Sequence, residues 1–262
     1  MLSDSGISPA DFPPFSGARA KSELFSASGL MALRQMASDL WLPVADEAIP
    51  EGWSKSPVDP NDLLSIFSPL RLRKGYVLRA YVFRMGGNGN GVVWAMPGDA
   101  PFPAPEDCPV LENHFGRTPK PRGALDDPME AIEGDGSAWS YMAASLLHRE
   151  LREFGAAWHG IYWGTHIILD DDPWKDGVPV GNRSLFESPT GDSEQWKWIV
   201  SPPTQWRPQV IIGSYYVTVT FHTYSGLGNQ AIYRHTDTYR AGNYRPKVEQ
   251  EMIAEGPSGF LF

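Results

Sequence analysis

The sequence predicts an α+β fold that combines a mostly antiparallel sheet with one long amphipathic helix and a long Pro-rich irregular segment. Apolar residues recur at helical spacing in the first part of the chain, whereas the later segments are rich in β-branched and aromatic residues. Those later segments are joined by glycine-containing loops and not by helices, and such connections favour antiparallel pairing.

The beginning of the chain differs from the rest in composition. Residues 1–20 contain three prolines among Ser, Gly and Asp and show no hydrophobic period. We therefore expect a flexible N-terminal arm without a core of its own. Residues 21–262 are expected to form a single α+β domain.

Two helices are expected early in this domain. Apolar residues recur at helical spacing from Leu30 to Trp41, Ser28 is placed to cap the start, and Pro43 prevents continuation. A second, shorter helix is predicted after Asp59, because an N-cap residue followed directly by a proline is typical of a helix start.

A β-hairpin is expected next. The β-rich runs at residues 74–84 and 91–96 flank a turn of glycine and asparagine at residues 86–90. Glycine-rich loops also bind phosphate when they lead from a strand into a helix. This loop leads back into a strand, so a hairpin turn is the better interpretation.

Residues 97–136 are the predicted irregular segment. They contain eight prolines, and residues 99–135 carry nine acidic side chains against three basic ones. Connections of this length are unusual within a compact fold. The segment is therefore expected to lie over the sheet or to mark a junction between two subdomains.

The long amphipathic helix is expected from Ser137 to Gly155. An apolar stripe runs through it, and four polar residues fall on the opposite side, which we expect to face solvent: His148, Arg149, Arg152 and Glu153. Strands are expected after this helix, at residues 161–170, 196–200, 209–224 and 231–239.

The candidate site lies on the predicted hairpin of residues 215–239. Val217, Val219 and Phe221 alternate along the first strand and define a core face, so the intervening polar residues point the other way. A six-residue loop at 225–230 would place the polar residues of the second strand beside them. The predicted ligand-binding residues are Thr218, Thr220, His222, Tyr233, His235 and Asp237. A bulge at Gly226 or Gly228 would shift the register by one and separate them.

This face has three interpretations. Thr, Tyr and His are typical of the solvated face of an antiparallel sheet. The same residues could floor a polar ligand pocket, or His222, His235 and Asp237 could form a two-His-one-carboxylate metal site, with Asp170 or Asp172 as extra ligands. The sequence Asp170-Asp171-Asp172 has a simpler interpretation as a solvated acidic turn that ends a strand.

Composition excludes several classes of function. The chain has 22 basic and 31 acidic residues, and its net charge of −9 disfavours nucleic acid and anionic membranes as partners. No run of about 18 apolar residues is present, so we expect no membrane span, and the start of the chain lacks the pattern of a secretory signal. Cys108 is the single cysteine, which fits a reducing, cytoplasmic location.

The sequence therefore predicts a soluble intracellular binding or interaction protein without catalysis, which holds a small polar ligand or a protein partner. The alternative is a metal-assisted, hydrolase-like enzyme that uses the His/His/Asp cluster. Docking through the acidic Pro-rich segment or the apolar tail at residues 259–262 is a third interpretation. No nucleophile motif is present, and the sequence indicates neither a particular cofactor nor an oligomeric state.

Overall fold

The structure, a computed structural model, describes the chain except for residues 1–19, 45–48, 114–115, 175–187 and 192. The expected arm at residues 1–20 lies outside the described residues apart from Ala20. Helices and strands are mixed, and the strand pairs of every sheet are antiparallel. The α+β class with antiparallel sheets is therefore confirmed. The described residues contain no helix that is long and apolar enough to cross a membrane.

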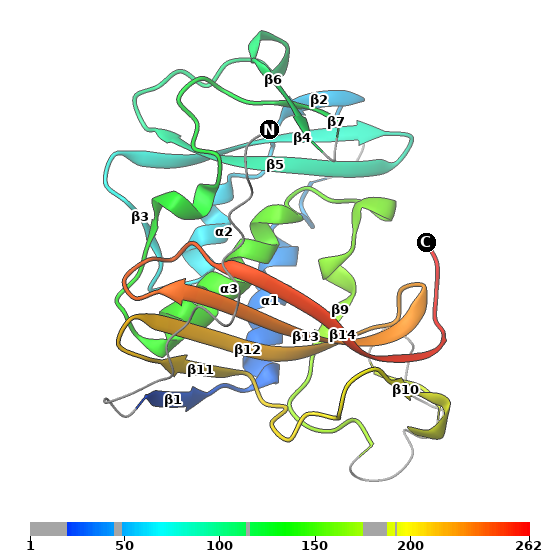
Figure 1. Cartoon of the computed structure of the whole chain (residues 1–262). Coiled ribbons are helices and arrows are strands. Elements are labelled where there is room, and N and C mark those ends of the chain that lie inside the picture. The colour runs from blue at the N-terminus through cyan, green and yellow to red at the C-terminus, as the bar shows by residue number, and fades with distance from the viewer. Residues whose placement is uncertain (1–19, 45–48, 114–115, 175–187, 192) are drawn as a thin grey trace, which may run out of the picture.

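In the described part of the chain, three α-helices lie between two sheets (Figure 1). They are α1 (Ala27–Asp39), α2 (Pro60–Ile66) and α3 (Ala138–Arg152). The smaller sheet has the order β2-β4-β5, from β2 (Gly52–Lys55), β4 (Tyr76–Met85) and β5 (Asn88–Pro97).

The larger sheet has the order β1-β11-β12-β13-β14-β10, and β9 also pairs with β12. Its strands are β1 (Lys21–Leu24), β9 (His166–Ile168), β10 (Lys197–Trp198), β11 (Gln209–Ile212), β12 (Tyr216–Ser225), β13 (Asn229–Arg240) and β14 (Lys247–Ser258). Two further pairs are β3 (Arg71–Leu72) with β8 (Ile132–Glu133), and β6 (Val110–Asn113) with β7 (Gly116–Pro119).

The β4–β5 hairpin turns more tightly than the sequence predicts. Only Gly86 and Gly87 separate the two strands, and their φ angles are +56° and +84°. Successive positive φ angles match the twist of a hairpin and require residues such as glycine. Asn88 and Asn90 therefore belong to β5 and not to the turn.

The Pro-rich segment at 97–136 is more regular than expected. It contains the short β6–β7 hairpin, the strand β8 and two single-turn 3₁₀ helices, η3 (Pro105–Asp107) and η4 (Pro128–Ala131). A high proline content does not exclude short elements, because proline is disfavoured inside long strands but is tolerated in edge strands and in the first turn of a helix.

Local capping fixes the start of α1. The side chain of Ser26, not that of Ser28, caps it by accepting a hydrogen bond from the backbone N–H of Gly29 at 3.4 Å. Asp170 adds a second acceptor, because its Oδ1 lies 2.8 Å from the backbone nitrogen of Ala27. One carboxylate of the predicted acidic turn thus holds the N-terminus of α1 against the end of β9.

The prediction that His148 and Arg149 of α3 face solvent is wrong. His148 and Arg149 are each 7% exposed, because one sheet lies on either side of the helix layer (Figure 1). Met142, Leu146 and Leu147 are fully buried, as the apolar stripe predicts. α3 is therefore a central buried helix whose charged residues need partners inside the protein.

Candidate functional site

The β12–β13 hairpin has a register one residue away from the predicted one. Phe221 lies opposite His235, and His222 lies opposite Arg234. The innermost pair, Ser225 with Ala231, is separated by five residues and not six, and Gly228 in this loop has a φ of +72°. Because side chains alternate along a strand, this single-residue change moves the whole second strand to the other face.

The predicted site residues therefore fall into two groups. His235 and Asp237 are fully buried on the sheet face that Val219 and Phe221 also occupy, toward α3. Tyr233 lies two residues before His235 and therefore on the same face. The other three, Thr218, Thr220 and His222, lie on the opposite face. The prediction that all six share one face is wrong, and so is the geometry of a metal site made of His222, His235 and Asp237. Among the described residues, no group of three His, Cys, Asp or Glu side chains could hold a metal ion.

Asp237 is buried because Arg149 of α3 neutralises it. The two Asp237 oxygens lie 2.6 and 2.9 Å from Nη1 and Nη2 of Arg149, which makes a bidentate ion pair. Arg149 also donates to the Ser145 carbonyl at 2.8 Å, and its guanidinium lies 4.9 Å from the centre of the Phe221 ring. A buried aspartate without a counter-charge would be costly, and this helix arginine removes that cost.

A chain of side-chain contacts extends from this ion pair to β9. His235 Nδ1 lies 3.4 Å from Arg149 Nη2, which can only donate, so Nδ1 accepts and the proton sits on Nε2. His235 Nε2 lies 2.8 Å from the Thr223 hydroxyl, which in turn lies 2.8 Å from His166 Nδ1. His235 Nε2–H therefore donates to the Thr223 oxygen, and the Thr223 hydroxyl donates to His166 Nδ1. The proton of His166 then sits on Nε2, which is buried and has no hydrogen-bond partner among the described residues.

Both of these histidines are neutral at pH 7. Burial, followed by the charge of nearby Arg34, lowers the pKa of His166 to about 3. Burial and the charge of Arg149 lower the pKa of His235 well below its ordinary value. Neither His235 nor Asp237 lines any of the clefts described below. We interpret this chain of contacts as a means of burying Asp237 and of joining α3 to the large sheet.

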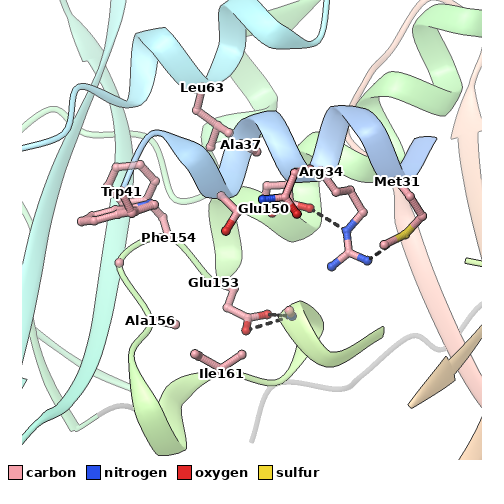
Figure 2. A pocket seen from close by; sticks show the side chains of 14 residues that line it. Met31, Arg34, Ala37, Trp41, Leu63, Glu150, Glu153, Phe154, Ala156 and Ile161 are labelled. Atoms are coloured by element: carbon pink, nitrogen blue, oxygen red, sulfur yellow. Dashed lines mark hydrogen bonds and ion pairs between the residues drawn. The ribbon is translucent and has the colours of Figure 1, made fainter. Parts of the chain in front are cut away.

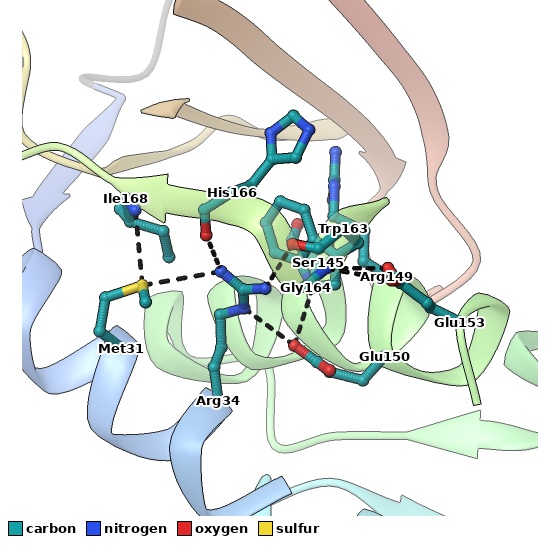
Figure 3. A network of polar contacts seen from close by, with 10 residues as sticks. All are labelled: Met31, Arg34, Ser145, Arg149, Glu150, Glu153, Trp163, Gly164, His166 and Ile168. Carbon is teal, nitrogen blue, oxygen red and sulfur yellow. Dashed lines mark hydrogen bonds and ion pairs between the residues drawn. The ribbon is translucent and has the colours of Figure 1, made fainter. Parts of the chain in front are cut away.

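A second buried arginine joins α1 to α3 (Figure 3). Arg34 Nε donates to Glu150 Oε1 at 3.0 Å, Nη2 donates to the Trp163 carbonyl at 2.6 Å, and Nη1 donates to the His166 carbonyl. Its guanidinium lies 3.9 Å from the centre of the Trp163 ring, and Trp163 Nε1 donates to the same Glu150 oxygen at 2.8 Å. These contacts fix the position of Glu150.

A cleft of about 220 Å³ opens beside this arrangement, between α1, the end of α3 and the loop that follows α3 (Figure 2). We call it the α1–α3 cleft. Its apolar wall includes Trp41 and Phe154, whose ring centres are 5.0 Å apart in an edge-to-face arrangement. The cleft is also lined by Met31, Arg34, Glu150, Glu153 and Ile161.

Glu153 is held in this cleft by backbone hydrogen bonds (Figure 2). Its Oε1 accepts from the N–H groups of Tyr162 at 2.6 Å and Gly164 at 3.1 Å, and its Oε2 lies 3.0 Å from the Gly164 nitrogen. Burial raises the pKa of Glu153 to about 7; these hydrogen bonds and Arg34 oppose the rise, and the nearby Glu150 carboxylate adds to it. The carboxyl group is thus fixed in place and titrates near neutral pH.

The charges in the α1–α3 cleft do not balance once Glu153 is ionised. Arg34 and Glu150 form an ion pair and cancel each other. Glu153 then leaves one uncompensated negative charge in a cleft with an aromatic wall. Electrostatic interactions in such a partly desolvated site are stronger than in water.

Sequence reasoning missed these residues for identifiable reasons. Arg34 falls between Leu30 and Ala37 in the apolar stripe of α1, and this position is the sequence signal that indicates its burial. The sequence predicts that Glu153 faces solvent on α3, because helical periodicity does not show that the loop around Tyr162 packs over it.

Asp172 and Cys108, two residues with candidate roles in the sequence, both form contacts within the protein. Asp172 Oδ1 accepts from the backbone N–H of Trp174 at 2.9 Å, as expected for an acidic turn. Cys108 is buried, and its sulfur lies 3.1 Å from the Tyr81 hydroxyl.

Comparisons of the chain with protein-family models, with curated proteins and with solved structures found no match. The fold itself defines the class: an α+β protein whose described residues form three α-helices between two antiparallel sheets. Its function must be inferred from its sites.

Proposed function

We propose that this protein is a non-catalytic binding protein whose α1–α3 cleft holds a small molecule with an apolar body and a cationic amino group. The observation that carries this proposal is the Glu153 carboxyl, fixed by three backbone contacts inside a cleft with an aromatic wall. This function keeps the expectation of a small-molecule binding protein, with a ligand that is partly apolar instead of polar, and moves its site from the β12–β13 hairpin to the helix layer.

The residues of the cleft favour a cation over an anion. Glu153 supplies a carboxylate whose charge is not cancelled, whereas Arg34 and Glu150 neutralise each other. An ammonium group can donate to carboxylate oxygens and also interact with the face of a tryptophan such as Trp41. An anionic ligand would meet the negative charge without gaining access to Arg34, which is already surrounded by four acceptors or rings.

The size of the cleft limits the ligand. Its volume of about 220 Å³ is below the roughly 300–1,000 Å³ typical of sites for drug-sized molecules. A single-ring amine is therefore a suitable probe, because its ring can contact Trp41 and Phe154 while its amino group reaches Glu153. Benzylamine, benzyl alcohol and benzoate form a matched series with a cationic, a neutral and an anionic group.

Benzylamine is expected to bind the wild-type protein at pH 8 at least tenfold more tightly than benzyl alcohol, as measured by isothermal titration calorimetry, and benzoate is expected not to bind. Lowering the pH from 8 to 6 is expected to weaken benzylamine binding, because Glu153, with a pKa of about 7, takes up a proton over this range. Equal affinities for benzylamine and benzyl alcohol, or an absence of benzylamine binding, would contradict the proposal.

Two variants locate the binding. Glu153→Gln and Trp41→Leu are each expected to weaken benzylamine binding at least tenfold, the first by removing the charge and the second by removing the ring. Glu249→Gln removes one negative charge at an exposed position of β14 and is the matched control, with unchanged binding expected. Thermal unfolding verifies that each variant is folded. If benzylamine binding survives in both cleft variants, the ligand site lies elsewhere.

A further inference from the structure

A second cleft lies on the other face of the large sheet, where the loop before β11 passes over β12 and β13. Its volume is about 200 Å³, and we call it the sheet-face groove. It is lined by Pro203, Thr204, Gln205, Arg207, Gln209, Thr220, His222 and Arg234. Two of these, Thr220 and His222, belong to the ligand-binding residues predicted from the sequence. The groove is separate from the α1–α3 cleft and shares no lining residue with it.

The groove is rich in hydrogen-bond donors. Two arginines, two threonine hydroxyls and two glutamine amides face it, and none of its described lining residues carries a carboxylate. This composition is unusual for a chain with a net charge of −9. Donors that converge from a loop and from the three strands β11, β12 and β13 can surround an oxyanion with several oxygens.

The two arginines are available to a ligand to different degrees. Arg207 is exposed, and its guanidinium forms no ion pair among the described residues. Arg234 donates through Nη2 to Glu251 on β14, which leaves its Nε and Nη1 hydrogens for another acceptor. Arginine presents its hydrogens in a planar fork that matches phosphate oxygens.

His222 adds an acceptor at the floor of the groove. It is 3% exposed, and its Nδ1 lies 3.4 Å from the carbonyl oxygen of Trp206. Since a carbonyl can only accept, Nδ1 carries the proton, and Nε2 keeps a lone pair. The ring is held in this position by the contact with Trp206, whose ring centre is 5.3 Å away.

We propose that the sheet-face groove binds the phosphate group of a small phosphate monoester. Its oxygens would accept hydrogen bonds from Arg207, Arg234 and Thr220. The singly protonated phosphate also has one O–H, which can donate to the Nε2 lone pair of His222. A sulfate ester has the same shape but carries no such proton near neutral pH, so the groove should discriminate between the two.

Methyl phosphate and methyl sulfate are the probes that test this proposal. In calorimetric titrations at pH 6 and low salt, where a large fraction of a phosphate monoester is singly protonated, wild-type protein is expected to bind methyl phosphate at least tenfold more tightly than methyl sulfate. Equal affinities for the two esters, or no binding of methyl phosphate, would overturn the proposal.

Variants of the lining residues provide the second part of the test. Arg207→Gln and Arg234→Gln are each expected to weaken methyl phosphate binding at least tenfold. Arg240→Gln is the matched control, because Arg240 is exposed on the same strand as Arg234 but does not line the groove. His222→Phe is expected to abolish the preference for phosphate over sulfate. If Arg207→Gln and Arg240→Gln behave alike in folded proteins, the groove does not bind the phosphate.

Discussion

Replacing Asp237 by Ala is expected to lower the free energy of unfolding by about 3–5 kcal/mol, because it leaves a buried arginine without its counter-charge. Asp237 is fully buried, and both of its oxygens contact Arg149. In the variant, the guanidinium would retain the Ser145 carbonyl and its ring contacts but would lose the carboxylate that pairs with it. Urea unfolding at pH 7 measures the change.

Two further variants test whether the loss of stability comes from the unpaired buried charge. Glu112→Ala removes one partner of an exposed ion pair, with side chains 77% and 74% exposed, and is expected to change stability by only about 0–1 kcal/mol. Asp237→Leu combined with Arg149→Met replaces both charges by apolar groups and is expected to recover most of the loss. A loss below about 1 kcal/mol for Asp237→Ala would contradict the buried ion pair.

Acidification from pH 7 to pH 5.5 is expected to lower the free energy of unfolding by about 3–4 kcal/mol. The cause is four buried histidines: His148, His166, His222 and His235. The pKa of each is lowered, to about 4 for His148 and His222, to about 3 for His166, and well below 6.5 for His235, and burial is the main cause in every case. Below pH 6.5 the unfolded chain therefore binds protons that the folded protein does not bind, so stability falls as the pH falls.

Glu153 opposes this effect. Its pKa is raised to about 7, so the folded protein takes up a proton at a higher pH than the unfolded chain and gains stability on acidification. Over this pH range each histidine contributes a loss of about 1.3 kcal/mol and Glu153 a gain of about 1.6 kcal/mol, which leaves a net loss of about 3–4 kcal/mol.

Urea unfolding at several pH values between 5.5 and 7 tests this balance. His148→Leu is expected to reduce the acid-dependent loss by about 1.3 kcal/mol, because one titrating group is removed. A free energy of unfolding that stays constant over this range, or a His148→Leu variant with the same pH dependence as wild type, would contradict the neutral buried state of the histidines.

The elements of the fold could largely be predicted from local patterns. Asp59 and Pro60 begin α2, the apolar stripe around Leu146 marks α3, and the glycines at 86 and 87 mark the β4–β5 turn. Each signal lies within a few residues of the element that it specifies. The α+β class follows from such local signals together with the loops between strands.

The candidate site could not be predicted in the same way, because it depends on partners distant in sequence. The face of Asp237 depends on whether five or six residues separate the innermost pair of β12 and β13, and the cost of burying it depends on Arg149 of α3. Glu153 looks like a surface residue until the Tyr162–Gly164 turn folds over it. Neither the parity of a loop nor the partner of a buried charge is encoded in local periodicity.

The carboxyl group of Glu153 allows the most direct measurement of the proposed function. Carbon-detected NMR of protein with ¹³C-labelled glutamate, assigned with Glu153→Gln, follows the titration of this carboxyl without and with saturating benzylamine. Free protein is expected to show a pKa of about 7, and benzylamine is expected to lower it, because a bound cation stabilises the carboxylate. A Glu153 carboxyl whose pKa is the same with and without benzylamine would contradict the assignment of the α1–α3 cleft as a site for cationic ligands.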